Sequence, residues 1–318
     1  MRDIQNELDT RKTPLQKVGV KGVRYPVTVL DKNERFQQTT AVADLYVNLP
    51  HNFKGTHMSR FIETFHKYHE DLTMNRFLEM LSEIREKLSA EKAFGCITFP
   101  YFIEKKAPVS GSSGIMEYNC SYEAEVSVTE GEPNNAAPQK ESHSYDSTNA
   151  PHSKCNGVAN TAHGTLPPAK SADVADGTRT AERRRFYITI EVPVTTLCPC
   201  SKAISEHGAH NQRGTVKVKL LYSEFFWIED IIAMIESCAS SPLYSVLKRR
   251  DEKYVTEHAY ENPRFVEDVV REVYIRLKKQ NFKWFSVECT NFESIHYHNA
   301  YAYAEYDGAE NAKGSSAT

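Results

Sequence analysis

Long hydrophobic runs are missing from this sequence of 318 residues. No apolar run approaches the roughly 18 to 20 residues that a membrane span needs, and the first segment, MRDIQNELDTRKTP, lacks the apolar stretch of a signal peptide. A large excess of one charge is missing too, because the formal net charge is −3 and the pI is near 6.5. We therefore expect a cytoplasmic protein with no membrane anchor and no nucleic-acid partner.

Cysteines are few, and their number, seven, is odd. This count argues against a disulfide framework and favours reduced thiols or metal ligands. No Gly-rich phosphate loop follows a strand pattern, which disfavours a P-loop nucleotidase. The remaining composition, 40% hydrophobic and 25% charged, is that of a globular protein with one large core or two domains.

Apolar residues are scarce between residues 130 and 183, a segment with one Leu, one Tyr and no Ile, Phe, Trp or Met. Such a segment buries too little apolar surface to offset the entropy lost on ordering. We predict a disordered insertion there. It contains Cys155, His152 and His163, which we do not expect to form a site.

The segments on either side of the insertion have a similar layout. Residues 185–194 place Phe, Ile and Val on one face, and residues 215–222 alternate Val and Leu with Lys, which are strand patterns. We predict strands at residues 41–49, 93–103, 115–128, 185–194, 215–222, 284–290 and 295–306. We predict helices at residues 59–67, 75–88, 227–237 and 264–279.

Each half is interpreted as strand, strand, helix, helix, strand, strand, which predicts an α+β protein built from two tandem units. Arg60-Phe61-Ile62-Glu63 and Arg264-Phe265-Val266-Glu267 are nearly the same and support duplication, although chance similarity between two helix starts is the alternative. The predicted domains are residues 1–129 for the first unit, 130–183 for the insertion, 184–307 for the second unit and 308–318 for a flexible tail.

Residues 195–214, TTLCPCSKAISEHGAHNQRG, form the segment richest in reactive side chains. Cys198 and Cys200 flank a proline, and His207 and His210 follow in the same loop. One thiolate, one imidazole and one carboxylate would leave an open position for water, as in catalytic metal sites. The alternative is a buried pair of small apolar thiols. Further acids and imidazoles follow at Asp251, Glu252, Glu257, His258, His296 and His298.

Three other groups of residues have both a structural and a chemical interpretation. His296 and His298 fall in a predicted strand, whose period of two places both rings on one face, either toward a cavity or at the surface. Glu267, in a first helical turn, either stabilises the helix dipole or accepts hydrogen bonds from a guanine edge. A set of basic residues either binds a triphosphate or forms a solvated charged surface. These residues are Lys21, Arg24, Lys202, Arg213, Lys248, Arg249, Arg250 and Lys253.

Residues 195–214 closely resemble the signature loop of the prokaryotic type IB GTP cyclohydrolase I family. Other segments resemble that family in the same order: residues 18–26, 55–60, 105–111 and 251–257, and the His296/His298 pair. The resemblance covers nearly the whole chain outside the insertion, which departs from the short connection that the family has between two strands.

The resemblance implies a tunnelling fold, in which antiparallel sheets with paired helices close into a barrel on oligomerisation, commonly as a homotetramer with sites at interfaces. It implies that Cys198, His210 and Glu252 bind the metal and that Glu267 anchors the guanine edge. It also implies that Cys200, His296 and His298 line the reaction centre. Among the phosphate ligands, Arg213 and Lys202 come first because they share the signature loop.

The expected substrate is GTP, and the expected products are formate and 7,8-dihydroneopterin triphosphate, at the start of pterin and folate biosynthesis. A mixed Cys, His and carboxylate set accepts Zn²⁺, Mn²⁺ or Fe²⁺, so the sequence does not select one divalent metal. Three alternatives stay open: a nitrile reductase of 7-deazaguanine metabolism with the same fold, a noncatalytic purine- or pterin-binding protein, and a structural metalloprotein.

Overall fold

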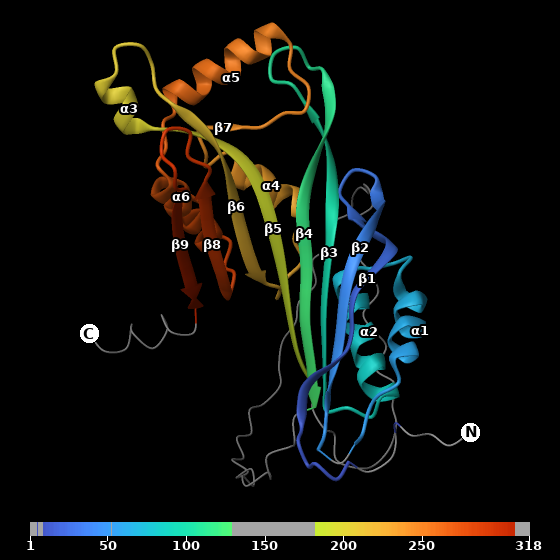
Figure 1. Ribbon diagram of the computed structural model, residues 1–318. Helices are drawn as coiled ribbons and strands as arrows, with labels where there is room; N and C mark the ends of the chain where they lie inside the picture. Colours follow the sequence, from blue (N-terminus) through green and yellow to red (C-terminus); the bar gives the residue numbers. More distant parts are fainter. Residues whose placement is uncertain (1–4, 6–8, 52, 129–181, 309–318) are drawn as a thin grey trace, which may run out of the picture. The chain divides into compact units, whose positions relative to one another are not determined.

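The structure, a computed structural model, describes residues 5, 9–51, 53–128 and 182–308. Within them, one antiparallel sheet of nine strands carries six helices (Figure 1). The strands are β1 (Leu15–Asp31), β2 (Arg35–Leu49), β3 (Lys92–Lys106), β4 (Ser113–Val128), β5 (Glu182–Leu197), β6 (Asn211–Leu221), β7 (Ser241–Pro242), β8 (Trp284–Asn291) and β9 (Ala300–Asp307). The helices are α1 (Met58–Tyr68), α2 (Met74–Lys87), α3 (Pro199–Ile204), α4 (Ile228–Glu236), α5 (Arg249–Glu261) and α6 (Val266–Lys279). The predicted α+β class with antiparallel strands is confirmed.

The strand order is β1-β2-β3-β4-β5-β6-β8-β9, with the short β7 paired to β5. Each half of the chain contributes four consecutive strands to this order. The halves meet where β4 pairs with β5, in a register that places Cys120 opposite Ile190. The described residues of the two halves therefore belong to one continuous sheet and to one compact unit.

One hydrophobic core lies between the sheet and the helices. The predicted alternation holds in β6, where Val216, Val218 and Leu220 are fully buried while Lys217 and Lys219 lie on the opposite face. Figure 1 shows α1 and α2 beside β1 to β4, and α4 and α6 beside the strands of the second half. The second face of the sheet carries charged side chains such as Lys217 and Lys219 together with exposed apolar ones such as Val42, Phe102 and Tyr303.

Helix α2 approaches the sheet closely at Gly95 in β3. A Cβ atom at that position would lie 2.8 Å from Phe77 Cζ and 2.9 Å from Leu81 Cδ2, both on α2. Glycine is therefore required there by contact and not by an unusual backbone angle. The close approach lets Phe77 and Leu81 fill the core under the strand, and both are fully buried.

Several elements differ from the sequence predictions. Helices α3 and α5 were not predicted, and neither were β7, β1 and the first six residues of β2. The last strand begins at Ala300 and not at residue 295, so the two histidines before it lie in a loop. Strand β5 begins at Glu182, which places the last two residues of the predicted insertion in the sheet. The rest of that insertion lies outside the described residues, as does the predicted tail beyond Gly308.

The four-residue echo does not mark equivalent positions. Arg60 is the third residue of α1, whereas Arg264 precedes the first residue of α6 by two positions. Moreover, α1 is the first helix of its half and α6 the last of the other half. The echo is therefore a chance similarity, and any argument for duplication depends on the order of the strands.

Across the part of the chain that the structure describes, no helix combines the length and the apolar character needed to cross a bilayer.

Glu83 of α2 generates a prediction about stability in acid. Burial alone would raise its pKa, but the ammonium groups of Lys67 and Lys87 and the Tyr68 hydroxyl lower the pKa to about 2. Because the folded pKa is depressed, this contribution to stability is present above pH 4.5, the ordinary value, and is lost as the pH falls toward 2. We expect Glu83→Gln to cost roughly 1 kcal/mol near neutral pH, and less at pH 3.

Thermal unfolding of wild type and Glu83→Gln at pH 7 and pH 3 checks this. Glu79→Gln is the matched control on the same helix, because Glu79 forms an exposed ion pair with Arg76. An equal deficit of Glu83→Gln at both pH values would contradict the assignment.

Candidate active site

The loop after β5 folds into a short helix that begins at a cysteine. Cys198 is the N-cap residue of α3, and Pro199 occupies the first helical position, where its missing N–H costs no hydrogen bond. The Cys198 Sγ atom accepts the backbone N–H of Ser201 at 3.4 Å. The Cys198 side chain is half-buried, whereas Cys200 is exposed. The structure therefore does not bring the two thiols into one enclosed cavity.

His210 lies at the other end of this loop, beside Cys198. The Cys198 N–H donates to the His210 carbonyl oxygen at 3.1 Å. His210 Nδ1 lies 3.1 Å from Gln212 Oε1 and 3.1 Å from Ser294 Oγ. Because buried Gln212 donates its Nε2 to Thr196 Oγ1 at 2.9 Å, its Oε1 only accepts. The neutral ring therefore carries its proton on Nδ1 and offers the lone pair of Nε2 to a ligand.

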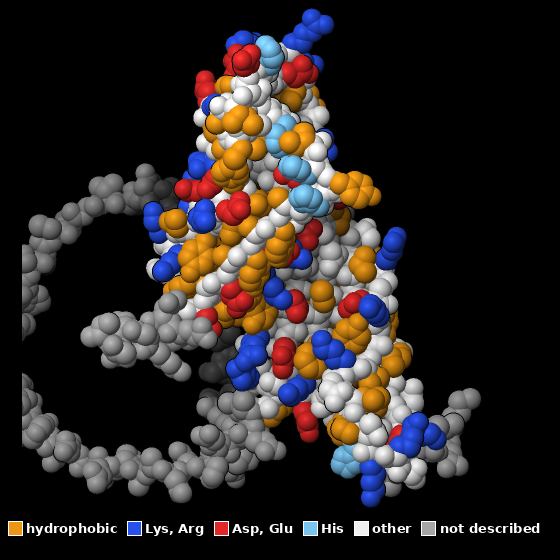
Figure 2. Space-filling view, turned by 60° about the vertical axis from the view of Figure 1, so that its left-hand side comes forward, with side chains coloured by type: hydrophobic (Ala, Val, Ile, Leu, Met, Phe, Trp, Pro, Cys, Tyr) orange, Lys and Arg blue, Asp and Glu red, His pale blue; other side chains and the backbone are white. Residues whose placement is uncertain are grey.

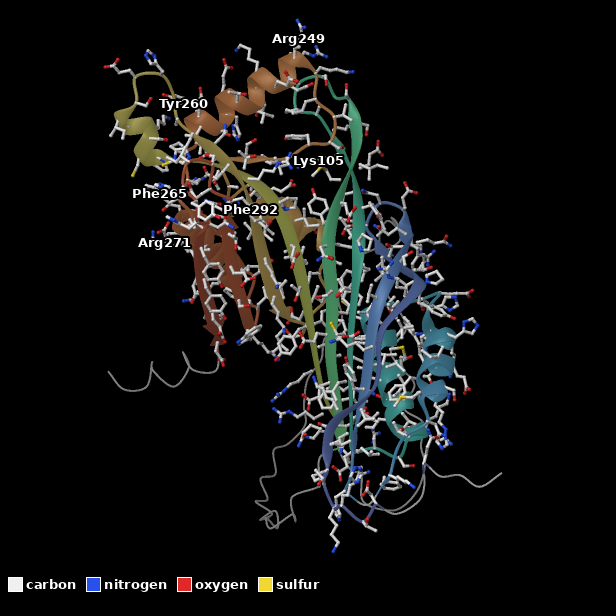
Figure 3. All side chains as sticks on the ribbon, in the orientation of Figure 1. Lys105, Arg249, Tyr260, Phe265, Arg271 and Phe292 are labelled. Carbon is white, nitrogen blue, oxygen red and sulfur yellow. The ribbon has the colours of Figure 1, made fainter. Side chains whose placement is uncertain are left out.

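Glu252 lies apart from this pair. It is an exposed residue of the first turn of α5, whereas α5 contacts α3 at its opposite end. There Lys202 Nζ donates to the Tyr260 carbonyl oxygen and lies 4.3 Å from the centroid of the Tyr260 ring. From Glu252 to Tyr260 the helix rises about 12 Å, and Figure 3 shows Tyr260 near α3 with Arg249 at the far end.

The structure thus unites two of the three expected metal ligands. In the described ranges, no three His, Cys, Asp or Glu side chains are close enough together to hold a metal ion.

Asp251, next to Glu252, has a different environment. Its buried carboxylate accepts the N–H groups of Val109 at 2.9 Å, Ser110 at 2.7 Å and Lys248 at 2.8 Å. Burial alone would raise the pKa of Asp251, but a hydrogen bond from the Ser110 hydroxyl and those from the three N–H groups lower it well below the usual range. No signal in the sequence indicates this contact, because Val109 and Asp251 are 142 residues apart.

Glu267 remains available at the start of α6. The neighbouring Asp268 caps this helix, accepting the Phe265 N–H at 3.0 Å. Glu267 is exposed, and the described residues offer it no hydrogen bond or ion pair. Its carboxylate is free to accept hydrogen bonds from a ligand, although its place in the first turn also suits the helix dipole.

His296 and His298 lie in the loop between β8 and β9, so the argument from strand periodicity is wrong. The two exposed rings are nevertheless close, with centroids 5.3 Å apart and planes inclined by 20°. The loop is attached to β6, because the Phe292 N–H donates to the Arg213 carbonyl oxygen at 2.8 Å. Its Ser294 reaches His210, which connects the histidine pair to the signature loop.

Glu293 in this loop was missed. One of its carboxylate oxygens, Oε2, is buried and has no hydrogen-bond partner among the described residues. A buried carboxylate oxygen is costly unless water, a cation or a ligand satisfies it, so Glu293 is a further candidate ligand in this loop. Its position next to Ser294 and three residues before His296 is the sequence signal that would have found it.

The two expected phosphate ligands differ in availability. The amine of Lys202 is engaged by Tyr260, as described above. Arg213, on β6, is exposed and forms no ion pair with the residues that the structure describes. The guanidinium group of Arg213 is therefore more available to a phosphate than the ammonium group of Lys202.

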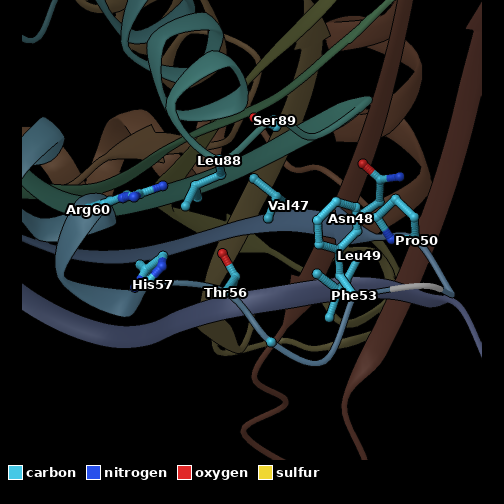
Figure 4. Close-up of a pocket in the computed structure, with 11 residues that line it drawn as sticks. Val47, Asn48, Leu49, Pro50, Phe53, Thr56, His57, Arg60, Leu88 and Ser89 are labelled. Carbon is cyan, nitrogen blue, oxygen red and sulfur yellow. The ribbon is translucent and has the colours of Figure 1, made fainter. Parts of the chain in front are cut away.

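A cavity of about 300 Å³ lies in the first half of the chain, away from these residues (Figure 4). It includes His57 and Arg60 from the segment 55–60. Arg60 Nη1 donates to the Lys87 carbonyl oxygen at 2.9 Å and so holds the end of α2. None of the expected metal or substrate residues lines this cavity.

Comparisons with known proteins agree over nearly the whole chain. The model of the family described as type I GTP cyclohydrolase FolE2 matches residues 1–154 and 160–302. GTP cyclohydrolase FolE2 of Geobacter metallireducens is 46% identical over 308 residues, covering 96% of this chain and 97% of the relative. The corresponding protein of Syntrophus aciditrophicus is 46% identical over 306 residues, covering 96% and 99%.

A hyperthermostable mutant of Bacillus sp. TB-90 urate oxidase is a solved structure with some likeness, at 8% identity and a TM-score of 0.47, covering 93% of this chain and 99% of that one. The family model and the sequence relatives decide the assignment. The chain belongs to the type I GTP cyclohydrolase FolE2 family.

Proposed function

We propose that this chain converts GTP and water into formate and 7,8-dihydroneopterin triphosphate. Membership of the family makes it a GTP cyclohydrolase and therefore a hydrolase. The observation that carries the proposal is the joint placement of Cys198 and His210 within a segment that the family model matches. A cytoplasmic location, as the first enzyme of pterin and folate synthesis, belongs to the same proposal.

We propose that Cys198 and His210 bind a divalent metal ion, Zn²⁺, Mn²⁺ or Fe²⁺. The donor chemistry fits, because His210 presents Nε2 while Gln212 and Ser294 hold Nδ1, as partners of metal-ligating histidines commonly do. A divalent ion held there would lower the pKa of water that it binds and so supply the nucleophile for C8 of GTP.

A carboxylate completes the ligand set, and two glutamates compete for this role. Family resemblance favours Glu252, although that residue lies toward the far end of α5 from α3. The unpaired oxygen of Glu293, in the loop that contacts His210, favours Glu293. Glu252 could reach an ion at Cys198 and His210 only after a rearrangement of α5 or from a neighbouring subunit. Within one subunit we therefore expect Glu293 to contribute more to metal affinity than Glu252.

The other residues act on the substrate. Glu267 accepts the N1–H and 2-amino hydrogens of guanine with its free carboxylate. His296 and His298 exchange protons with the purine nitrogens as the five-membered ring of guanine opens. Cys200 lies beside the reacting part of the substrate. Arg213 and Lys202 bind the triphosphate. The ammonium group of Lys202 does so while it also donates to the Tyr260 carbonyl oxygen, or after that hydrogen bond breaks.

We propose that the chain assembles as a homotetramer with a closed tunnelling-fold barrel. In the described sheet β1 and β9 are edge strands with one partner each, and edge strands favour pairing with another chain. Figure 2 shows hydrophobic side chains gathered on the side of the molecule that carries β9. Large exposed apolar residues near the candidate site are Phe265, Phe292, Ile295, Tyr297, Tyr301 and Tyr303.

The function predicts metal-dependent formation of two products. We expect protein stripped by a chelator to leave GTP intact, and protein resupplied with Zn²⁺ or Mn²⁺ to release formate and a fluorescent dihydropterin in equal amounts. Survival of GTP under every metal condition would reject the proposal. Reduction of 7-cyano-7-deazaguanine with NADPH, or binding of GTP without formate, would then identify the reductase or the noncatalytic binding protein.

Replacing a metal ligand and replacing the guanine anchor should give different defects. We expect Cys198→Ala to lose turnover and metal together, because one donor is removed. We expect Glu267→Ala to raise KM for GTP by at least about tenfold while metal content stays unchanged, because a charge-assisted hydrogen bond contributes about 1.5 to 3 kcal/mol. Metal analysis and steady-state kinetics on both variants provide the check, and normal turnover by Cys198→Ala would contradict the metal assignment.

The two carboxylates can be separated by the matched pair Glu293→Gln and Glu252→Gln. Both substitutions remove one negative charge and keep the side-chain volume. We expect Glu293→Gln to weaken metal affinity by about 10- to 100-fold, and Glu252→Gln to weaken it less. Titration with Mn²⁺ in the absence of GTP measures both affinities, and a larger loss in Glu252→Gln would assign the ligand to α5.

A further inference from the structure

The outer part of the β3–β4 hairpin extends beyond the rest of the sheet. The ladder between β2 and β3 ends at Thr98, and the ladder between β4 and β5 starts at Asn119. Residues 99–118 therefore form a two-stranded arm with no third strand beside it. At its base, the backbone of Pro100 and Phe102 hydrogen-bonds to the side chains of Thr39 and Gln37 in β2. A two-stranded hairpin is marginally stable alone, so this arm depends on the residues against which it packs.

The arm packs along the segment that leads into α5. Lys105 Nζ donates to the Leu243 carbonyl oxygen at 2.8 Å and to Glu236 Oε1 at 2.7 Å, and both charged side chains are largely buried. On the other strand, a Cβ atom at Gly114 would lie 2.3 Å from Ser245 Oγ, so the two segments are in direct contact. The strands of the arm are thereby fixed against residues 243–245.

The tip of the arm hydrogen-bonds to Asp251, in the first turn of α5. Asp251 Oδ1 accepts the N–H groups of Val109 and Ser110, and its Oδ2 accepts the N–H of Lys248 and so caps α5. The side chain has no exposed surface. One carboxylate therefore joins the first half of the chain to the beginning of a helix in the second half.

The opposite end of α5 is attached to the loop of Cys198. Lys202 of α3 donates to the Tyr260 carbonyl oxygen, where a cation also suits the negative end of the helix dipole. Shortly after α5, the Arg264 N–H donates to the carbonyl oxygen of Leu197, the residue immediately before Cys198. Helix α5 thus has the arm at one end and both sides of Cys198 at the other.

We propose that Asp251 is a positioning residue, which ties the arm to α5 and thereby fixes the loop that carries Cys198. Without Asp251 the tip of the arm would lose its hydrogen bonds to α5, and α5 would lose its cap, while Lys105 and Gly114 would still hold the strands of the arm. Small displacements of a reacting group lower turnover while substrate affinity is retained. The kinetic consequence rests on the proposed function, whereas the structural tie does not.

Asp251→Asn, which keeps the shape and removes the charge, tests the proposal. We expect kcat to fall at least about tenfold while KM for GTP changes less than about threefold. We also expect faster amide hydrogen exchange at Val109 and Ser110 and in residues 198–210. Asp230→Asn is the matched control, because Asp230 is also the third residue of its helix but forms an exposed pair with Lys32. It should change neither readout.

A second pair of variants acts from the arm and leaves Asp251 in place. Val109→Pro removes one N–H that Asp251 accepts, whereas Val109→Ala keeps it and shortens only an exposed side chain. We expect only Val109→Pro to lower kcat and to speed exchange in residues 198–210, and this pair decides the question if Asp251→Asn does not fold.

Unchanged exchange in residues 198–210 in folded Asp251→Asn, with unchanged kcat, would overturn the proposal. If wild-type protein turns over no GTP with any metal, the proposed function fails, and the exchange data still support or overturn the tie.

Discussion

The backbone ladder between β4 and β5 is the interaction on which the rest of the structure depends. It pairs Asn119–Val128 with Glu182–Glu191 and is the junction at which the sheet of the first half continues into that of the second. The entropy of closing the chain between these strands grows only slowly with its length, so a long connection is compatible with the pairing. Tyr122 and Phe186, whose rings lie 5.3 Å apart, seal the core across the junction.

The direction of these strands decides where the candidate site lies. Beyond the ladder, β5 continues to Leu197 and delivers Cys198, while β4 and β3 continue as the two-stranded arm toward the same end of the sheet (Figure 1). Helix α5 spans the space between the arm and the Cys198 loop. A site built this way takes its rigidity from the sheet and its reactive groups from loops, as in many enzymes.

Local patterns in the sequence were sufficient for most strands, for four of the helices and for the Cys198–His210 loop. They failed where a contact joins distant residues. Helix α5 is rich in charged residues, and what fixes its start is a carboxylate bonded to a hairpin 142 residues earlier. The histidine pair was placed in a strand because alternation cannot distinguish a strand from a loop whose rings stack. Glu293 required knowledge of burial, which no local pattern supplies.

Hydrogen-bond satisfaction separates the acidic residues that maintain the fold from those available for chemistry. Helices α5 and α6 each place an aspartate in their third position, and in both helices it accepts the N–H of the N-cap residue. The adjacent glutamates, Glu252 and Glu267, have no part in the cap and remain exposed. The aspartates therefore cap the two helices, and neither cap uses the carboxylate of the neighbouring glutamate. Substituting Glu252 or Glu267 should for this reason leave the caps of α5 and α6 intact, so that a loss of activity in such a variant can be separated from a loss of helix structure.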